Sequence, residues 1–188
     1  NFPTRIERLE KFSTIVKEHV YIKRDDQTGT EFSGNKIRKL EYSINEAINN
    51  DCDTLITCGG IQSNHARATA AAGIKLGLKS ILVLRSDEKP ELEGNYLIDK
   101  IMGADVRIIS SEDYRERRQE IMENILKELE AKGRKGYIIP EGASNGIGTF
   151  GYLACFKEIL KQEKEHGIIF DTIVTAVGSG GTFAGLYL

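Results

Sequence analysis

A strand, a tight turn and a helix start follow one another in the segment Thr54-Leu55-Ile56-Thr57-Cys58-Gly59-Gly60-Ile61-Gln62-Ser63-Asn64-His65. The run 54–58 is apolar and β-branched, as in a buried strand, and two glycines end it. Ser63 is a favoured helix N-cap residue, and the alanine-rich stretch 64–76 that follows is typical of a helix. The segment therefore predicts a βα unit of a parallel sheet.

The same alternation continues on both sides of this unit. Further strands are predicted at 20–23, 80–84, 106–109, 137–139 and 172–177, and further helices at 36–49, 95–102, 113–132 and 148–165. Short strands that alternate with helices favour an α/β fold with parallel strands. Right-handed crossovers place the loops after these strands at one edge of the sheet, where ligands bind.

The composition is that of an ordinary globular protein. The chain has 188 residues, is 40% hydrophobic and carries a net charge of −2, which allows one large domain or two small ones. Mixed charges indicate no nucleic-acid or membrane surface, so we expect neither partner. No apolar run approaches the roughly 20 residues of a membrane span. The first residues contain no signal segment, so we expect a cytoplasmic protein.

Three cysteines, Cys52, Cys58 and Cys155, show neither a disulfide pattern nor a histidine at metal-ligand spacing. Buried, inert thiols in a reducing compartment are the expected state. We therefore expect no metal site.

Lys36 follows a Gly-Asn turn in Ser33-Gly34-Asn35-Lys36-Ile37-Arg38-Lys39-Leu40 and stands at a helix start. As one of 26 basic residues it would by default face solvent. The positive helix end disfavours a charged amine, however, and so lowers its pKa. A neutral amine is what a Schiff-base lysine needs to attack a carbonyl.

Ser63, Asn64 and His65 open the helix after the first strand described above. One interpretation is a helix cap alone, with a structural histidine. In the other, the free N–H groups of the helix start bind a substrate carboxylate, Asn64 donates to a ring oxygen, and His65 carries a proton.

A third motif, Gly178-Ser179-Gly180-Gly181-Thr182, again follows a predicted strand and opens a helix. It is either a tight turn or a phosphate nest, in which glycines let backbone N–H groups converge. It is not a dinucleotide fingerprint, because Phe183 occupies the third glycine position, and it lacks the Gly-Lys of a P-loop. A reactive amine, a carboxylate site and a phosphate cradle together indicate pyridoxal phosphate (PLP) and an amino-acid substrate.

Together these motifs resemble the D-cysteine desulfhydrase and 1-aminocyclopropane-1-carboxylate (ACC) deaminase family, a branch of the tryptophan-synthase-β-like PLP enzymes. The matching segments are 21–26, 34–41, 59–67, 139–145 and 178–182. They occur in the order found in the family and span nearly the whole chain.

The resemblance implies roles for individual residues. Lys36 would join PLP covalently, and Asn64 would contact the ring hydroxyl. Ser63, with neighbouring backbone N–H groups, would hold the substrate carboxylate beside Asn64 and His65. The PLP phosphate would lie against Ser179, Gly180, Gly181 and Thr182. Lys36 and Ser63 are the expected catalytic residues.

The resemblance also implies a fold of two open, twisted parallel-sheet domains with three αβα layers. Residues 1–38 and 147–188 would form the large PLP-binding domain, and residues 39–146 the small inserted domain. Members of the family continue past the glycine loop, so we expect the large domain to be incomplete in this chain. A homodimer is the expected assembly.

The function that follows is a PLP-dependent lyase or deaminase acting on a small amino acid. D-cysteine desulfhydrase, which forms pyruvate, hydrogen sulfide and ammonia, is the first choice, because ACC deaminases of this family commonly have glutamine at the position of His65. ACC deaminase, which opens a cyclopropane ring to form 2-oxobutanoate and ammonia, is the alternative. A non-catalytic ligand-binding module and a nucleotide-binding α/β domain are alternatives of other classes.

Overall fold

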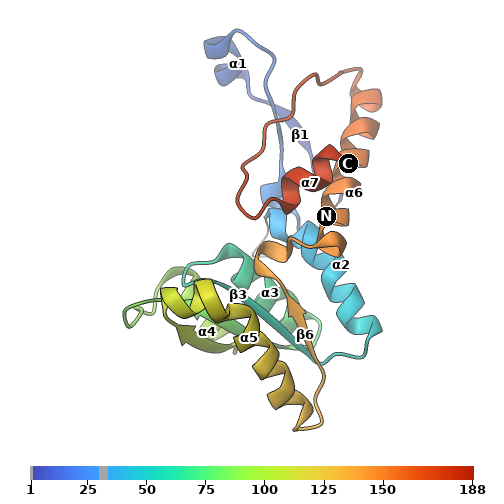
Figure 1. Ribbon diagram of the computed structural model, residues 1–188. Helices are drawn as coiled ribbons and strands as arrows, with labels where there is room; N and C mark the ends of the chain where they lie inside the picture. Colours follow the sequence, from blue (N-terminus) through green and yellow to red (C-terminus); the bar gives the residue numbers. More distant parts are fainter. Residues whose placement is uncertain (1, 30–33) are drawn as a thin grey trace.

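The computed structural model describes residues 2–29 and 34–188 (Figure 1). Ser33 of the lysine motif lies outside these residues. The elements are β1 (Ile6–Arg8), α1 (Glu10–Val16), β2 (Tyr21–Lys23), η1 (Asp25–Gln27), α2 (Asn35–Asn49), β3 (Thr54–Gly60), α3 (Asn64–Lys75), β4 (Lys79–Arg85), α4 (Gly94–Ile101), β5 (Asp105–Ile109), α5 (Ser111–Glu130), β6 (Gly136–Ile139), η2 (Glu141–Ala143), α6 (Gly146–His166) and α7 (Gly181–Tyr187).

A four-stranded parallel sheet in the order β5-β4-β3-β6 forms the centre of one half of the molecule. The chain moves outward from β3 to β4 and β5, and α5 then returns it to β6 on the opposite side of β3. The direction of winding therefore reverses between β3 and β6. In open α/β sheets, ligands bind beyond the carboxyl ends of the strands at such a point.

Helices cover both faces of this sheet, because successive side chains of a strand point to opposite sides. Ile56 and Cys58 of β3 pack against α5 on one face of the sheet. Leu55 points to the opposite face, where it packs against α2 and α3. Leu82 and Leu84 of β4 contact the region of α3 and α4. The expected α/β class, with three layers, is thus confirmed.

The other half of the molecule is built from α2, α6, α7 and an antiparallel β1–β2 ribbon (Figure 1). Glycines allow its helices to touch through their backbones. A Cβ at Gly151 of α6 would lie 2.2 Å from the carbonyl oxygen of Arg38, and one at Gly185 of α7 would lie 2.5 Å from that of Thr149. These contacts hold α6 against α2 and α7 against α6.

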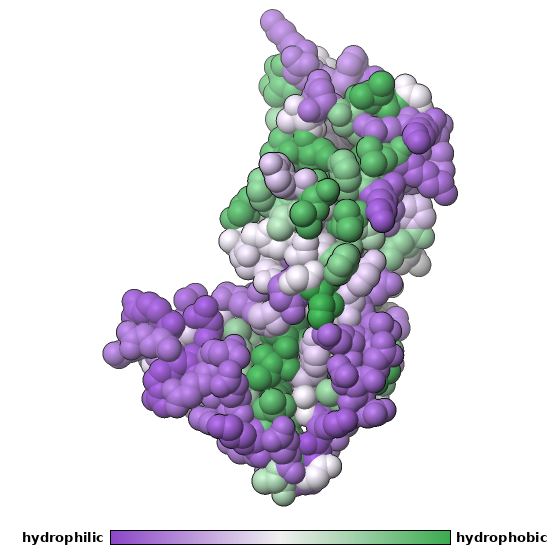
Figure 2. Space-filling view, turned by 45° about the vertical axis from the view of Figure 1, so that its right-hand side comes forward, coloured by the Kyte–Doolittle hydropathy of each residue, from purple (hydrophilic) through white to green (hydrophobic). Residues whose placement is uncertain are grey.

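The prediction of a strand at 172–177 is wrong. This segment has no hydrogen-bonded strand neighbour in ranges 2–29 and 34–188, and Val174 is 90% exposed. An apolar run becomes a strand only where a partner supplies its backbone hydrogen bonds. The second parallel sheet is likewise not formed among the described residues, and β2 pairs antiparallel with β1. Figure 2 shows hydrophobic side chains exposed on this upper half of the molecule.

The domain boundaries at 38/39 and 146/147 remain a prediction, which the packing of α2 supports. Leu40 and Ile44 of this helix pack against the parallel sheet, whereas Arg38 contacts Glu158 of α6. The helix therefore passes from one half of the molecule to the other within its first two turns.

Cys58 and Cys155 are buried, and burial raises the pKa of each thiol, in Cys155 to about 12, as expected of inert cysteines. Cys52 is half-buried, which corrects the expectation that all three are buried. Within the described part of the chain, no cluster of three potential metal ligands occurs and no helix is long and apolar enough to cross a membrane.

Candidate active site

Lys36 lies in the first turn of α2, next to the glycine loop. Gly34, with φ +140°, begins the helix in a conformation that side-chain-bearing residues rarely adopt. Lys36 Nζ donates to Asn35 Oδ1 at 3.0 Å, and Asn35 Nδ2 donates to Thr182 Oγ1 at 3.3 Å. Burial lowers the pKa of Lys36. The pKa is shifted in the expected direction, but the cause is desolvation by burial and not the positive helix end.

Lys39 is a second cation on the same side of α2, one turn after Lys36. The residue is 1% exposed, and its Nζ donates to Ser144 Oγ at 2.9 Å. No carboxylate within the described ranges forms an ion pair with it. Burial, together with the neighbouring charge of Lys36, lowers its pKa to about 8. A buried cation whose partner is only a hydroxyl is suited to an incoming anion.

The glycine loop closes over this cation. Gly180 has φ +85°, and Gly181 begins α7. A Cβ at Gly181 would lie 2.6 Å from Ser144 Oγ and 3.0 Å from Lys39 Nζ, so a larger residue there would displace these two groups. Ser179 Oγ is 2.6 Å from Ser144 Oγ. The backbone N–H groups of this loop, two hydroxyls and a buried ammonium fit the phosphate of PLP.

Ser63 caps α3, as the sequence predicts. Its Oγ accepts a hydrogen bond from the Ala66 N–H at 3.1 Å. Gly59, near the end of β3, makes room for it, because a Cβ there would lie 2.5 Å from Ser63 Oγ. Ser63 is half-buried and Asn64 is exposed, so both can meet a ligand beyond the carboxyl end of β3.

His65 is 3% exposed, and its Nε2 lies 2.8 Å from Thr57 Oγ1. The Thr57 hydroxyl donates to the Ile139 carbonyl at 2.8 Å, so the histidine must be the donor to Thr57. Burial, with the charges of Lys36 and Lys39, lowers the pKa of His65 to about 3. His65 is therefore neutral near pH 7, which favours the structural role over proton transfer. Its contact with substrate stays a prediction.

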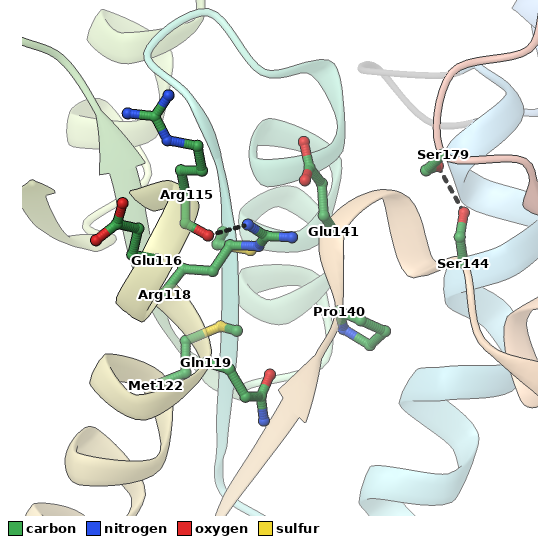
Figure 3. Close-up of a pocket in the computed structure, with 10 residues that line it drawn as sticks. Arg115, Glu116, Arg118, Gln119, Met122, Pro140, Glu141, Ser144 and Ser179 are labelled. Atoms are coloured by element: carbon green, nitrogen blue, oxygen red, sulfur yellow. Dashed lines mark hydrogen bonds between the residues drawn. The ribbon is translucent and has the colours of Figure 1, made fainter. Parts of the chain in front are cut away.

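A cavity of about 510 Å³ lies where the sheet reverses its winding. Cys58 of β3 and Pro140 after β6 line it, and Figure 3 shows Arg115 and Arg118 of α5 on one side and the Ser144–Ser179 pair on the other. The cleft thus lies between the parallel sheet and the glycine loop.

Sequence reasoning missed two parts of this site. Lys39 had a usable signal, since a spacing of three residues from Lys36 puts both on one helix face. Arg115 and Arg118 had none, because they belong to a long helix whose charges are indistinguishable from a solvated surface.

We expect Ser63→Ala in the full-length chain to damage turnover more than folding. Loss of the cap costs about 1 kcal/mol of stability. Loss of a hydroxyl that holds the substrate or handles a proton lowers kcat/KM by about 100-fold or more. Ser110→Ala is the matched control, since Ser110 caps α5 by accepting from the Asp113 N–H at 3.0 Å. Melting temperature and kcat/KM are measured for both. Equal turnover in the two variants would return Ser63 to a purely structural role.

A family described as pyridoxal-phosphate dependent enzyme matches residues 1–188. The bifunctional D-cysteine desulfhydrase/1-aminocyclopropane-1-carboxylate deaminase of Arabidopsis thaliana, named as mitochondrial, is 47% identical over 196 aligned positions, which cover 100% of this chain and 49% of that protein. The 1-aminocyclopropane-1-carboxylate deaminase of Rhizobium rhizogenes is 42% identical over 193 positions, covering 98% and 57%.

A crystal structure of an ACC deaminase homologue matches with a TM-score of 0.91 and 48% identity, covering 99% of this chain and 55% of that one. The chain therefore spans about half the length of the relatives it matches. Because the family match covers every residue, this chain belongs to the pyridoxal-phosphate dependent enzyme family.

Proposed function

We propose that the full-length protein is a PLP-dependent lyase acting on a small amino acid, with D-cysteine desulfhydrase as its first activity. The observation that carries this proposal is a half-buried lysine of lowered pKa beside a glycine loop that encloses a second, buried lysine. A lysine of lowered pKa and a cradle for an anion are the two features that PLP requires.

Different residues of the chain would hold the phosphate, the ring and the substrate. The loop from Ser179 to Thr182, with Lys39, holds the phosphate, and Asn64 donates to the ring hydroxyl. Lys36 attaches the cofactor and moves the proton on the substrate α-carbon. Ser63 and the N–H groups at the start of α3 hold the substrate carboxylate. PLP, when bound, supplies the electron sink for this chemistry.

ACC deaminase is the second candidate, because the named relatives include both activities. Products distinguish the two. Incubation of the full-length protein with D-cysteine should form pyruvate, hydrogen sulfide and ammonia, whereas ACC should form 2-oxobutanoate and ammonia. Cofactor binding without turnover of either substrate would contradict the proposal and favour a ligand-binding module.

We also propose a cytoplasmic homodimer. The exposed apolar side chains on α7, among them Phe183 and Tyr187, are a surface that the rest of the full-length chain or a second copy would cover. Light scattering of the full-length protein would test the assembly, and a monomer would contradict it.

We expect Gly181→Asp to abolish phosphate binding and leave the parallel sheet folded. The new side chain would collide with Ser144 and Lys39, and its carboxylate would pair with the cation that the phosphate needs. Gly146→Asp is the matched control, since Gly146 also begins a helix but has open space around it. Titration with PLP is the measurement. Equal affinities in the two variants would mean that the glycine loop is only a turn.

A further inference from the structure

The start of α4 is bonded to the loop that carries Asn64. Asn95, in the first turn of α4, donates from Nδ2 to the Gln62 carbonyl at 2.8 Å and to Asn64 Oδ1 at 2.9 Å. Its backbone N–H donates to Gln62 Oε1 at 2.7 Å. Arg67 of α3, one turn after Asn64, donates from its guanidinium to Asn95 Oδ1 at 2.9 Å. The Asn95 side chain thus contacts a guanidinium, which can only donate a hydrogen bond, and a backbone carbonyl, which can only accept one.

These partners determine which way both amides face. A guanidinium can only donate, so the oxygen of the Asn95 amide must face Arg67. A backbone carbonyl can only accept, so the Asn95 nitrogen must face Gln62. The same nitrogen reaches Asn64, which must therefore offer its oxygen. The exposed Asn64 side chain is left with its Nδ2 group, which makes no hydrogen bond within the described part of the chain.

We propose that Asn95 is a positioning residue, which turns the Asn64 amide so that it presents a donor to the ligand. The inference rests on the proposed function, in which Asn64 faces the ring hydroxyl of PLP. The inference also goes beyond the proposed function. It requires the ligand atom at Asn64 to be a hydrogen-bond acceptor, and it assigns this selectivity to Asn95, a residue on another helix. The deprotonated ring oxygen of PLP is such an acceptor.

Asn95→Asp tests this proposal in the full-length chain. The substitution keeps the size of the side chain and the bond from Arg67, but it places an oxygen against both Asn64 Oδ1 and the Gln62 carbonyl oxygen, of which only the Asn64 amide can turn over. The Asn64 amide then turns over and presents its oxygen to the ligand. We expect the affinity for PLP to fall about tenfold or more, because two acceptors then face each other. The affinity for 3-deoxypyridoxal phosphate, which lacks the ring oxygen, should be unchanged.

Two further variants keep the test decisive. Asn95→Ala removes the donor without adding charge, and it should lose affinity for PLP preferentially but by less. Gln62→Met removes the Gln62 bonds to the Asn95 N–H and to the Glu93 carbonyl, but not the bond between Asn95 and Asn64. It should change both affinities equally.

The outcomes separate this proposal from the one it rests on. Equal loss of both ligands in Asn95→Asp, or no loss of either, would overturn the positioning role while the proposed function stands. Absence of binding of both ligands to the unmodified protein would overturn the proposed function itself.

Discussion

Lys36→Ala should eliminate covalent attachment of PLP and lower kcat/KM of the full-length protein by on the order of 10³-fold or more. Loss of a proton-transfer group alone accounts for about 10²- to 10⁴-fold, and the attachment point is lost with it. Lys36 is assigned this role because it follows the Gly34-Asn35 turn beside the glycine loop, where it is half-buried and has a lowered pKa. Borohydride reduction of the unmodified protein, followed by peptide mapping, should place the pyridoxyl group on Lys36.

The control for this experiment is Lys11→Ala, because Lys11 is exposed on α1 and should be dispensable. Lys39 is the informative competitor, since it is close to the same loop and its pKa is also lowered. A pyridoxyl label on Lys39 or Lys23 would contradict the assignment of Lys36.

Arg38→Met should lower the free energy of unfolding by about 3–5 kcal/mol, the cost of leaving a buried charge unpaired. The Arg38 side chain is 2% exposed and donates to both carboxylate oxygens of Asp25, at 2.8 and 2.9 Å. It also donates to both oxygens of Glu158 at 2.9 Å. The substitution therefore leaves Asp25 without this cation and with the hydroxyls of Thr4 and Tyr152, whereas Glu158 keeps its ion pair with Lys23 at 3.0 Å. Urea denaturation of the full-length protein gives the measurement.

Arg117→Met is the matched control, because Arg117 pairs with Asp113 and Glu120 on the exposed side of α5. Such exposed pairs contribute about 0–1 kcal/mol. If the two variants lost the same free energy of unfolding, the claim that burial makes the Arg38 ion pairs more stabilising than exposed ones would be contradicted.

The Arg38 network also predicts how stability depends on pH. Burial opposes ionisation of Asp25 and Glu158, but the hydrogen bonds from Arg38 outweigh it and hold both pKa values below the ordinary 3.8 and 4.5. Carboxylates of lowered pKa stabilise the fold above their ordinary values. Their contribution is lost as the pH falls below those values. Arg38→Met should therefore be less sensitive to acid in this range than the unmodified protein.

Short-range sequence patterns were sufficient to predict most of the parallel sheet. The strands predicted at 54–58 and 80–84 lie within β3 and β4, and the helix predicted to begin after Ser63 does so. These segments could be predicted because their signals are short-range: a run of β-branched residues, glycines that end it and a capping hydroxyl. The run at 172–177 carries the same signal and forms no strand, because no neighbouring strand lies beside it in the described ranges.

The amino-acid sequence by itself determined the α/β class, the capping role of Ser63 and the identity of the three motifs. Only the tertiary structure decided that Lys39 is a buried cation under the glycine loop, that His65 is neutral and bonded to Thr57, and that Asn95 orients Asn64. The physical reason is the range of the interactions. Capping and strand signals act within a few residues. The Lys39–Ser144 and Asn64–Asn95 contacts instead join segments about 100 and 30 residues apart, and the Thr57 hydroxyl that meets His65 is fixed by the Ile139 carbonyl of another strand.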